Sequence, residues 1–329
     1  MNVMLRERDS SIEIMKFLAV ILVMNSHMEL LYGKYSALAT GGAIGDILFF
    51  FASGYTILLG RGGNFTNWYK RRINRIYPTV FALAIISSLF LDNKANMIDI
   101  IIDGGGWFVT CIMIYYVIFW FVKRFFINHL KCFFALSSII VLIWYVFFFE
   151  NKERVWMYGY TYFKWVHYFL FMLLGAIMGL RKKQFHDSYR IPKFTNSLVG
   201  LFLCIILWYG IQYLGTINTY MAYFQVVSLL PLLGIAFFFY QLCNTSKLIK
   251  IYNNKWLHRP MYWISALCLE VYVCQNYFYT DKFNYLFPLN LIGCACIIFC
   301  VAYGLKILSN WFSQTFQEMD YDWKKMVTL

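Results

Sequence analysis

The chain is poor in charged residues. Only 14% of its 329 residues are Asp, Glu, Lys or Arg, whereas soluble domains contain about a quarter. No polar stretch is long enough to build a soluble domain, and 61% of the residues are hydrophobic. This composition excludes an ordinary soluble protein and indicates an integral membrane protein that forms a single unit.

Several motifs of well-known enzyme classes are also missing. The sequence has no HExxH, P-loop or GxSxG motif, so a metalloprotease, an NTPase and a serine hydrolase all lose support. Nine cysteines are present, but there is no CxxC pair and none falls in a predicted outward loop, so neither a disulfide framework nor a thiolate metal site is indicated. We therefore expect no metal and no bound cofactor.

Apolar stretches bounded by polar residues predict an all-α polytopic fold with about ten transmembrane helices. The predicted ranges are 12–32, 42–60, 77–91, 107–122, 132–149, 165–180, 196–214, 220–242, 261–279 and 288–308. We expect residues 1–308 to form the membrane-embedded domain. Residues 309–329 are expected to form a short cytoplasmic tail that lies on the inner membrane surface, because its apolar residues recur at helical spacing. Those residues are Phe312, Phe316, Met319 and Trp323.

The distribution of basic residues predicts the orientation. With the N-terminus inside, 23 of the 29 Lys and Arg residues fall on the inner side. The other side keeps Lys34, Lys94, Lys152, Arg154, Lys164 and Lys282. This split satisfies the positive-inside rule and predicts that both termini are cytoplasmic. The net charge of +13 is therefore a topological signal and does not indicate nucleic-acid binding.

The first apolar segment carries a basic residue and a histidine, in the stretch KFLAVILVMNSH from Lys16 to His27. Eleven residues of α-helix turn roughly 1100°, only about 20° past three full turns, and rise about 16 Å. Lys16 and His27 therefore share one helix face, which runs from a membrane surface to the interior. Ionisable residues inside membrane spans are costly and are functional candidates by default. A histidine that only packs is the alternative for His27.

Asp46 lies in the second segment, GGAIGDILFFFASGYTI (41–57). Counted from the outer ends of the two helices, Asp46 and His27 reach a similar depth, so Asp46 could orient the imidazole and raise its basicity. A carboxylate favoured by the positive end of the helix dipole is an equally good interpretation. Further along the same segment, Ser53 and Tyr55 are possible hydrogen-bond donors to an oxyanion.

Glu270 and Gln275 lie in the predicted ninth helix, within SALCLEVYVCQNYF (265–278). A carboxylate in the middle of a span needs a partner. A structural pair with a basic residue is as good an explanation of Glu270 as a place in a substrate pocket. Gln275 lies slightly more than one helical turn further outward.

The inward segment NWYKRRINRIYP (67–78) contains the densest group of basic residues. If it is helical, Arg71, Arg72 and Arg75 project two or three guanidinium groups to one side. Guanidinium groups bind phosphate oxygens through two hydrogen bonds. A positive-inside anchor is the alternative, and it is the better interpretation of Lys70 and Arg61.

These segments resemble signatures of the acyltransferase 3 family of bacterial integral membrane O-acyltransferases. Lys16 to His27 fits the family's pattern of a basic residue followed eleven positions later by histidine, and Arg71 to Arg75 fits its RxxxR pattern. The stretch GDILFFFASGYTI (45–57) is similar to the second-helix signature that ends in Ser-Gly-aromatic. Weaker similarities lie in GWFVTCIMIYY (106–116) and SALCLEVYVCQN (265–276), where Gln275 replaces a frequent histidine.

The resemblance implies transfer of an acyl group, usually acetyl from cytoplasmic acetyl-CoA, to a hydroxyl of a cell-surface polysaccharide or its lipid-linked precursor. It implies a multi-pass protein of the bacterial inner membrane. It makes His27 the essential histidine, and it makes Lys16, Arg71 and Arg75 the positive groups near the donor. The residues leave open whether His27 acts as a base or accepts the acyl group itself.

A polytopic transporter or flippase for a glycan or a lipid-linked sugar is the main alternative, because it would also contain about ten helices with polar groups inside the membrane. The sequence shows no internal repeat, which argues against the inverted-repeat class. The acceptor glycan, the hydroxyl position, the size of the acyl group and the oligomeric state do not follow from the sequence.

Overall fold

The structure, a computed structural model, describes residues 9–91, 96–102, 104, 106–185, 190–315 and 321–329. All regular secondary structure in these ranges is helical, which confirms the predicted all-α class. Some predicted features lie outside the described ranges, namely Lys94, Phe316, Met319 and two of the 23 inner basic residues, Arg6 and Arg8. The chain divides into two compact units, and each is described by itself.

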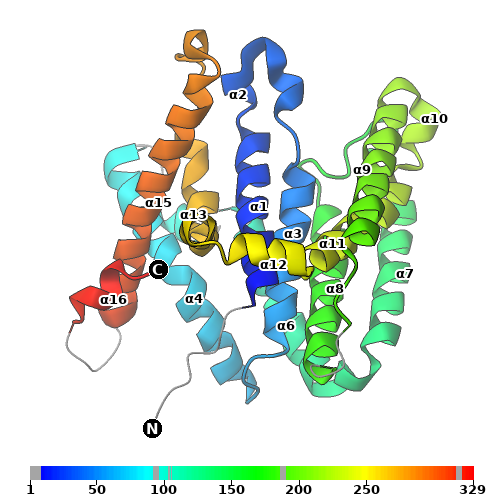
Figure 1. Cartoon of the computed structure of the whole chain (residues 1–329), viewed down its shortest axis with the longest axis horizontal. Coiled ribbons are helices and arrows are strands. Elements are labelled where there is room, and N and C mark those ends of the chain that lie inside the picture. Colours follow the sequence, from blue (N-terminus) through cyan, green and yellow to red (C-terminus); the bar gives the residue numbers. More distant parts are fainter. Residues whose placement is uncertain (1–8, 92–95, 103, 105, 186–189, 316–320) are drawn as a thin grey trace. The chain divides into compact units, whose positions relative to one another are not determined.

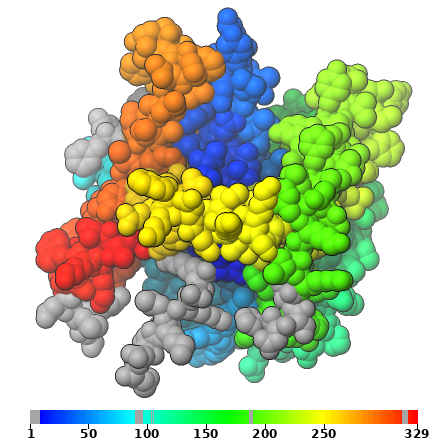
Figure 2. Space-filling model, in the orientation of Figure 1, coloured from blue at the N-terminus to red at the C-terminus, as the bar shows by residue number. Residues whose placement is uncertain are grey.

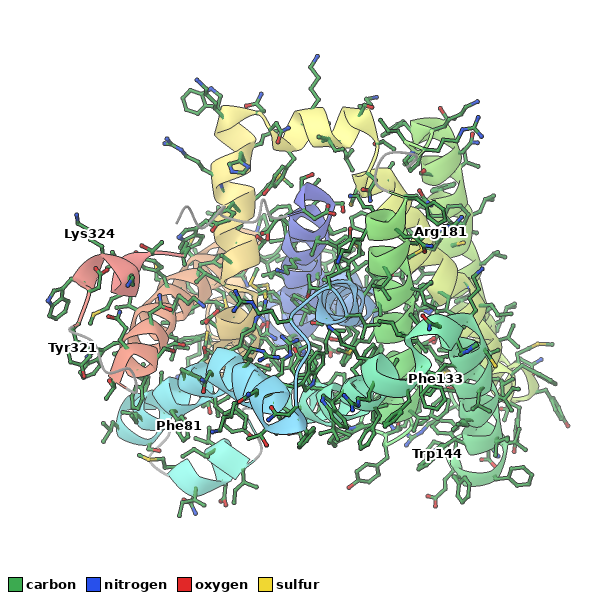
Figure 3. The ribbon with its side chains drawn as sticks, turned by 90° about the horizontal axis from the view of Figure 1, so that it is seen from below. Phe81, Phe133, Trp144, Arg181, Tyr321 and Lys324 are labelled. Atoms are coloured by element: carbon green, nitrogen blue, oxygen red, sulfur yellow. The ribbon has the colours of Figure 1, made fainter. Side chains whose placement is uncertain are left out.

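The first unit contains Met1–Ala19, Ala43–Gly60 and Phe125–Tyr262. Its helices are the first part of α1 (Ser10–His27), most of α3 (Gly42–Ile57), α7 (Leu130–Phe148), α8 (Lys164–Gln184), α9 (Phe194–Ile217), α10 (Thr219–Ala222), α11 (Leu229–Cys243), α12 (Ser246–Tyr252) and the start of α13 (Lys255–Ala266). Helices α9 and α11 lie side by side (Figure 1). The short helix α12 lies at the surface of the unit (Figure 2). Helix α7 packs on α8, where Phe133 meets Phe169 edge to face with ring centroids 6.3 Å apart (Figure 3).

Glycines allow α3 and α8 to approach each other closely in the first unit. A Cβ atom at Gly54 would collide with the backbone carbonyl of Met172, and one at Gly175 would collide with the carbonyl of Phe51. Because the atoms in the way belong to the backbone, they cannot move aside cheaply. Gly54 therefore has a packing role within the Ser-Gly-aromatic element.

The second unit contains Val20–Gly42, Arg61–Arg124 and Trp263–Leu329. Its helices are the last part of α1, α2 (Glu29–Tyr32), α4 (Phe65–Ile86), α5 (Met97–Ile102), α6 (Trp107–Phe121), the end of α13, α14 (Cys268–Cys274), α15 (Leu289–Thr315) and α16 (Trp323–Val327). Helix α4 packs along α15 and also contacts α6 and α14. The ring of Phe81 on α4, labelled in Figure 3, stacks on Phe312 of α15 at 6.3 Å.

Four stretches of the described chain are long and apolar enough to cross a membrane, namely Trp107–Phe148, Phe194–Ile217, Gln225–Cys243 and Leu289–Thr315. A fifth span results if Ser10–His27 and Glu29–Leu38, which are bent by 65° to each other, are counted as one. Each of the ten predicted ranges contains helix, but length and composition identify only these four or five as spans. The number ten stays a prediction.

Helix α4 differs most from its predicted range. The sequence places its start near Tyr77, whereas the helix begins at Phe65 and continues through Pro78. The side chain of Asn64 caps it by accepting a hydrogen bond from the Asn67 N–H at 3.0 Å, which satisfies one of the free donors of the first turn. Hydropathy missed this half of the helix because its exposed face is basic, although Trp68 is fully buried.

Two other helix boundaries also differ from prediction. The last long helix continues past 308 to Thr315, because Leu305 and Ser309 are buried and Phe312 packs on α4. Phe312 therefore belongs to α15 and not to a separate interfacial helix. The predicted ninth helix is interrupted at Leu267, between α13 and α14.

Candidate functional site

Helix α1 carries both Lys16 and His27, as the sequence predicts, and His27 is its last residue. The imidazole is exposed, so it is not sealed among apolar side chains. Lys16 pairs with Glu13 one turn earlier, with Nζ and Oε1 3.8 Å apart, and the Glu13 side chain is only 4% exposed. The ammonium group of Lys16 is thus partly neutralised by its own helix.

The imidazole of His27 lies over the ring of Tyr279 in the second unit. The ring centroids are 6.4 Å apart and the planes are inclined by 16°. The Tyr279 hydroxyl donates to Gln275 Oε1 at 3.0 Å and lies 3.4 Å from the Met24 carbonyl oxygen. Gln275 is buried. The predicted pocket residue Gln275 is therefore connected to His27 through Tyr279, which the sequence analysis did not select although it lies four residues after Gln275.

Asp46 belongs to the first unit and accepts a hydrogen bond from the Tyr168 hydroxyl at 3.3 Å. The ammonium group of Lys164 also acts electrostatically on this carboxylate. Only 6% of Lys164 is exposed. Both partners come from the start of α8, far from Asp46 in the sequence, so no local pattern could reveal them. The pairing of Asp46 with His27 stays a prediction.

Tyr55 and Ser53 follow on the same helix, α3. The Tyr55 hydroxyl donates to Asp9 Oδ2 at 2.6 Å, so its proton is not available to an oxyanion in this conformation. Ser53 is half-buried. Tyr55 and Ser53 are the two proposed donors to an oxyanion. Of these, Ser53 is the one whose hydroxyl donates to no other group among the described residues.

Asp9 is the centre of a polar network at the start of α1. Lys182 Nζ lies 2.8 Å from Asp9 Oδ2 and 2.6 Å from Asn244 Oδ1, and the Ser11 hydroxyl donates to Asp9 Oδ1 at 2.6 Å. Burial alone would raise the pKa of the Asp9 carboxyl, but the charge of Lys182 and the hydrogen bonds from Lys182, Ser11 and Tyr55 bring that pKa below its ordinary value. The network connects α1, α3 and α8.

The arginine group lies on the first half of α4, which is helical as the spacing predicts. Arg71 and Arg75 are exposed, and Arg71 donates to the carbonyl oxygens of Arg61 at 3.1 Å and Gly62 at 2.9 Å. Within the described part of the chain, no carboxylate lies within ion-pairing distance of Arg71, Arg72 or Arg75. The positive charge of this group is therefore available to an anionic ligand.

Arg72 takes a different orientation from the other two arginines. Its guanidinium carbon lies 4.7 Å from the Trp68 ring centroid and 5.4 Å from that of Tyr116, which is cation–π geometry. Its Nε atom is buried and finds no hydrogen-bond partner among the described residues. Lys123 Nζ lies 5.4 Å from the same Trp68 ring, so the π-helical segment Val122–Phe126, which follows α6, adds a cation that was not among the predicted site residues.

Glu270 is the first acidic residue of α14 and is only 1% exposed. Its Oε1 atom accepts from Lys306 Nζ at 3.1 Å and from the Thr79 hydroxyl at 3.0 Å. Its Oε2 atom has no hydrogen-bond partner among the described residues. The structure thus shows a basic partner for Glu270, and its place in a substrate pocket stays a prediction.

No group of three or more His, Cys, Asp or Glu residues in the described ranges could hold a metal ion. The second unit supplies an exposed imidazole at His27 and guanidinium groups on α4 that no described carboxylate neutralises. Such groups can move a proton, act as a nucleophile and bind an anion.

Comparison with known proteins identifies the family. A family model described as an acyltransferase domain, Acyl_transf_3, matches residues 9–311, nearly the whole chain. No curated protein and no solved structure matches the chain significantly. The matched region contains every candidate site residue discussed above and all of the stretches that could cross a membrane except the last four residues of Leu289–Thr315. The chain therefore belongs to the acyltransferase 3 family and is a membrane acyltransferase.

Proposed function

We propose that this protein transfers an acetyl group from acetyl-CoA to a hydroxyl of a cell-surface polysaccharide or its lipid-linked precursor. The observation that carries the proposal is the exposed imidazole of His27 at the end of α1, in a chain of an acyltransferase family. Histidine is the side chain best suited to exchange protons near neutral pH.

The arginine group on α4 is proposed to bind the phosphates of the CoA donor. Arg71 and Arg75 are exposed, and no described carboxylate neutralises them, which supports this assignment. Planar guanidinium groups pair with phosphate oxygens through two hydrogen bonds. Lys16 would contribute a further charge, in competition with its bond to Glu13. Arg72 would act mainly through the aromatic rings that it covers.

Two reaction paths agree with these groups. In direct transfer, His27 takes the proton of the acceptor hydroxyl while the hydroxyl oxygen attacks the carbonyl carbon of the thioester. The CoA thiolate then leaves and receives the proton from His27. In a relay, an imidazole nitrogen attacks the thioester first and the CoA thiol leaves. The acceptor hydroxyl oxygen then attacks the acyl carbon, the bond from this carbon to the imidazole breaks, and the hydroxyl proton passes to the departing ring, which is thereby regenerated. Asp46 and Ser53 are proposed to assist as orienting group and oxyanion donor.

We further propose the topology that the charges predict, with about ten spans, cytoplasmic termini and location in a bacterial inner membrane. The presence of helix in each of the ten ranges and the 23 inner basic residues among 29 support it. In this orientation the arginine group faces the compartment that supplies acetyl-CoA.

The decisive experiment uses the purified full-length protein with radiolabelled acetyl-CoA. We expect label to be hydrolysed, retained on the protein or transferred to an added glycan, and we expect His27→Ala to abolish this chemistry while the protein still inserts into the membrane. His129→Ala changes another exposed histidine and serves as the matched control. Flux of a glycan without any acyl chemistry would instead support a transporter, and full activity of His27→Ala would remove His27 from the mechanism.

A further inference from the structure

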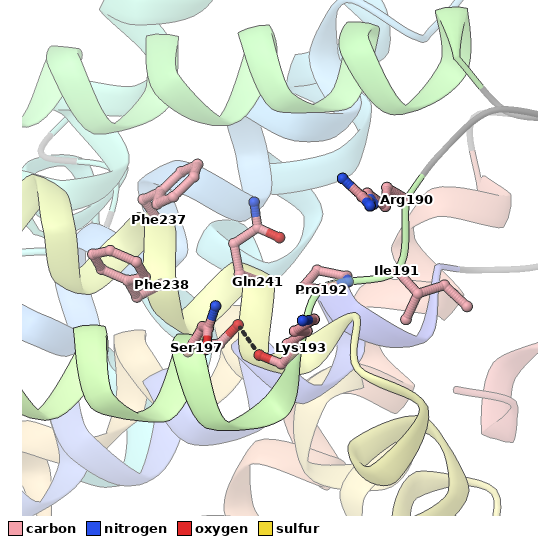
Figure 4. A pocket seen from close by; sticks show the side chains of 9 residues that line it. Arg190, Ile191, Pro192, Lys193, Ser197, Phe237, Phe238 and Gln241 are labelled. Carbon is pink, nitrogen blue, oxygen red and sulfur yellow. Dashed lines mark hydrogen bonds between the residues drawn. The ribbon is translucent and has the colours of Figure 1, made fainter.

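A pocket of about 520 Å³ opens between α9 and α11 in the first unit (Figure 4). Its volume lies within the usual range of small-molecule sites, about 300–1,000 Å³. Phe237, Phe238 and Gln241 of α11 line one side. The segment that leads into α9 lines the other and contributes Arg190 and Lys193. None of these residues belongs to the proposed acyl-transfer site.

The aromatic side of this pocket is held by close helix packing. A Cβ atom at Gly200 of α9 would overlap the ring of Phe238 at 2.6 Å, and one at Gly234 of α11 would overlap the sulfur of Cys204 at 2.5 Å. Side chains that fill the space over a glycine on the facing helix have little freedom to move. The apolar wall is therefore preformed.

The rim of the pocket is cationic. Arg190 and Lys193 are both exposed, and neither forms an ion pair or a side-chain hydrogen bond with any described residue. Lys247 adds charge nearby, since its Nζ atom lies 4.4 Å from the ring centroid of Phe194, the residue after Lys193. The Gln241 amide supplies a neutral donor between the cations and the aromatic wall (Figure 4).

The pocket also lies at the ends of two long apolar helices. Phe194–Ile217 and Gln225–Cys243 are two of the stretches that can cross a membrane, and the pocket joins the start of the first to the end of the second. Just beyond it, the apolar residues Leu198 and Val199 of α9 are exposed to 44% and 51%. A ligand whose anionic end is held by the rim could therefore place an apolar chain along α9.

We infer that this pocket binds the headgroup of one anionic phospholipid, with its phosphate between Arg190 and Lys193 and its acyl chains against Phe238 and the exposed face of α9. Basic pockets at the ends of transmembrane helices suit such headgroups. A free phosphate ion would make no use of the aromatic wall, so the lipid is the better match. The inference does not depend on acyl transfer.

The test measures the melting temperature of the full-length protein in detergent as phosphatidylglycerol is added. We expect the lipid to raise the melting temperature. For the variant Arg190→Gln/Lys193→Gln, the lipid concentration that gives half of the maximal rise should be at least roughly tenfold higher than for the parent. The charge-conserving variant Arg190→Lys/Lys193→Arg should respond like the parent. Lys250→Gln/Lys255→Gln removes two exposed cations outside the pocket and should also respond like the parent.

Several results would overturn the inference. These are equal titrations of the parent and the Arg190→Gln/Lys193→Gln variant, an equal response to phosphatidylcholine, or a weakened response of the charge-conserving variant. A full shift produced by inorganic phosphate alone would also overturn it, since the site would then bind a free anion and not a lipid.

Discussion

The ring of Tyr279 lies nearly parallel to the imidazole of His27, with the two centroids 6.4 Å apart. The tyrosine is in turn fixed by its hydrogen bond to the buried side chain of Gln275. The histidine that the family resemblance makes essential is thus supported by a residue more than 250 positions away in the sequence. This relationship gives Tyr279 the role of a positioning residue in the proposed reaction.

Tyr279→Phe keeps the ring beside His27 and removes only the hydroxyl that reaches Gln275. A neutral hydrogen bond contributes about 0.5–1.5 kcal/mol, so we expect the rate of acetyl transfer to fall roughly 2- to 10-fold. The KM for acetyl-CoA should stay the same, because the partners of the hydroxyl are Gln275 and Met24 and not the arginine group. Steady-state kinetics with labelled acetyl-CoA measure both quantities. Tyr277→Phe, at an exposed neighbouring position, is the control, and equal rates for the two variants would show that the hydroxyl has no positioning role.

Arg71→Gln and Arg75→Gln should each raise the KM for acetyl-CoA by about tenfold at low ionic strength, since a hydrogen bond to a charged group contributes about 1.5–3 kcal/mol. The difference from the parent should shrink as salt is added, because salt screens exposed charges. Lys70→Gln removes a charge from the same helix at another exposed position and should change the KM little. If all three variants lose affinity equally, the effect comes from general surface charge and not from a phosphate site.

Asp9→Asn should lower the free energy of unfolding by about 1–3 kcal/mol at neutral pH, because it removes the charge that Lys182 contacts at 2.8 Å. The two side chains are 24% and 27% exposed, which keeps the expected loss below that of a fully buried pair. Denaturant titration of the detergent-solubilised protein measures the loss. Lys183→Gln, at the exposed position next to Lys182, is the control and should be neutral.

The same pair predicts a dependence of stability on pH. The pKa of Asp9 is lower in the folded chain than its ordinary value of 3.8, so the unfolded chain binds the proton more readily. The contribution of Asp9 is therefore complete above about pH 4 and is lost as the pH falls through the lowered folded value. The difference in free energy of unfolding between the parent and Asp9→Asn should be constant between about pH 5 and about pH 7. It should shrink below about pH 4. A difference that stays the same at low pH would contradict this assignment.

Lys306→Met should destabilise the protein by about 3–5 kcal/mol, because it leaves the buried carboxylate of Glu270 without its cation. The double variant Glu270→Gln/Lys306→Met should recover most of the loss, since no buried charge then remains uncompensated. Thermal melts of the four proteins of this cycle give the coupling energy. Additive losses would mean that the pair at 3.1 Å contributes no specific interaction.

Local patterns in the sequence predicted the class of the protein and part of its site. Hydropathy and charge distribution were sufficient for the all-α membrane class, and the 3.6-residue period placed Lys16 and His27 on one helix. The same period placed Arg71 and Arg75 one turn apart on a helix that the structure confirms. Hydropathy was wrong about the start of α4 and the end of α15, because both segments are amphipathic and are held by packing and by the cap at Asn64.

Contacts between distant segments were decided only by the tertiary structure. The approach of Tyr279 to His27, the bond from Lys182 to Asp9 and the pair of Glu270 with Lys306 join residues from separate segments of the chain. Helical periodicity fixes which residues share a face, but it carries no information on which other helix that face will meet. The sequence by itself therefore determined a membrane acyltransferase fold with a candidate histidine and an arginine group, whereas packing of the helices decided which partners fix the polar side chains.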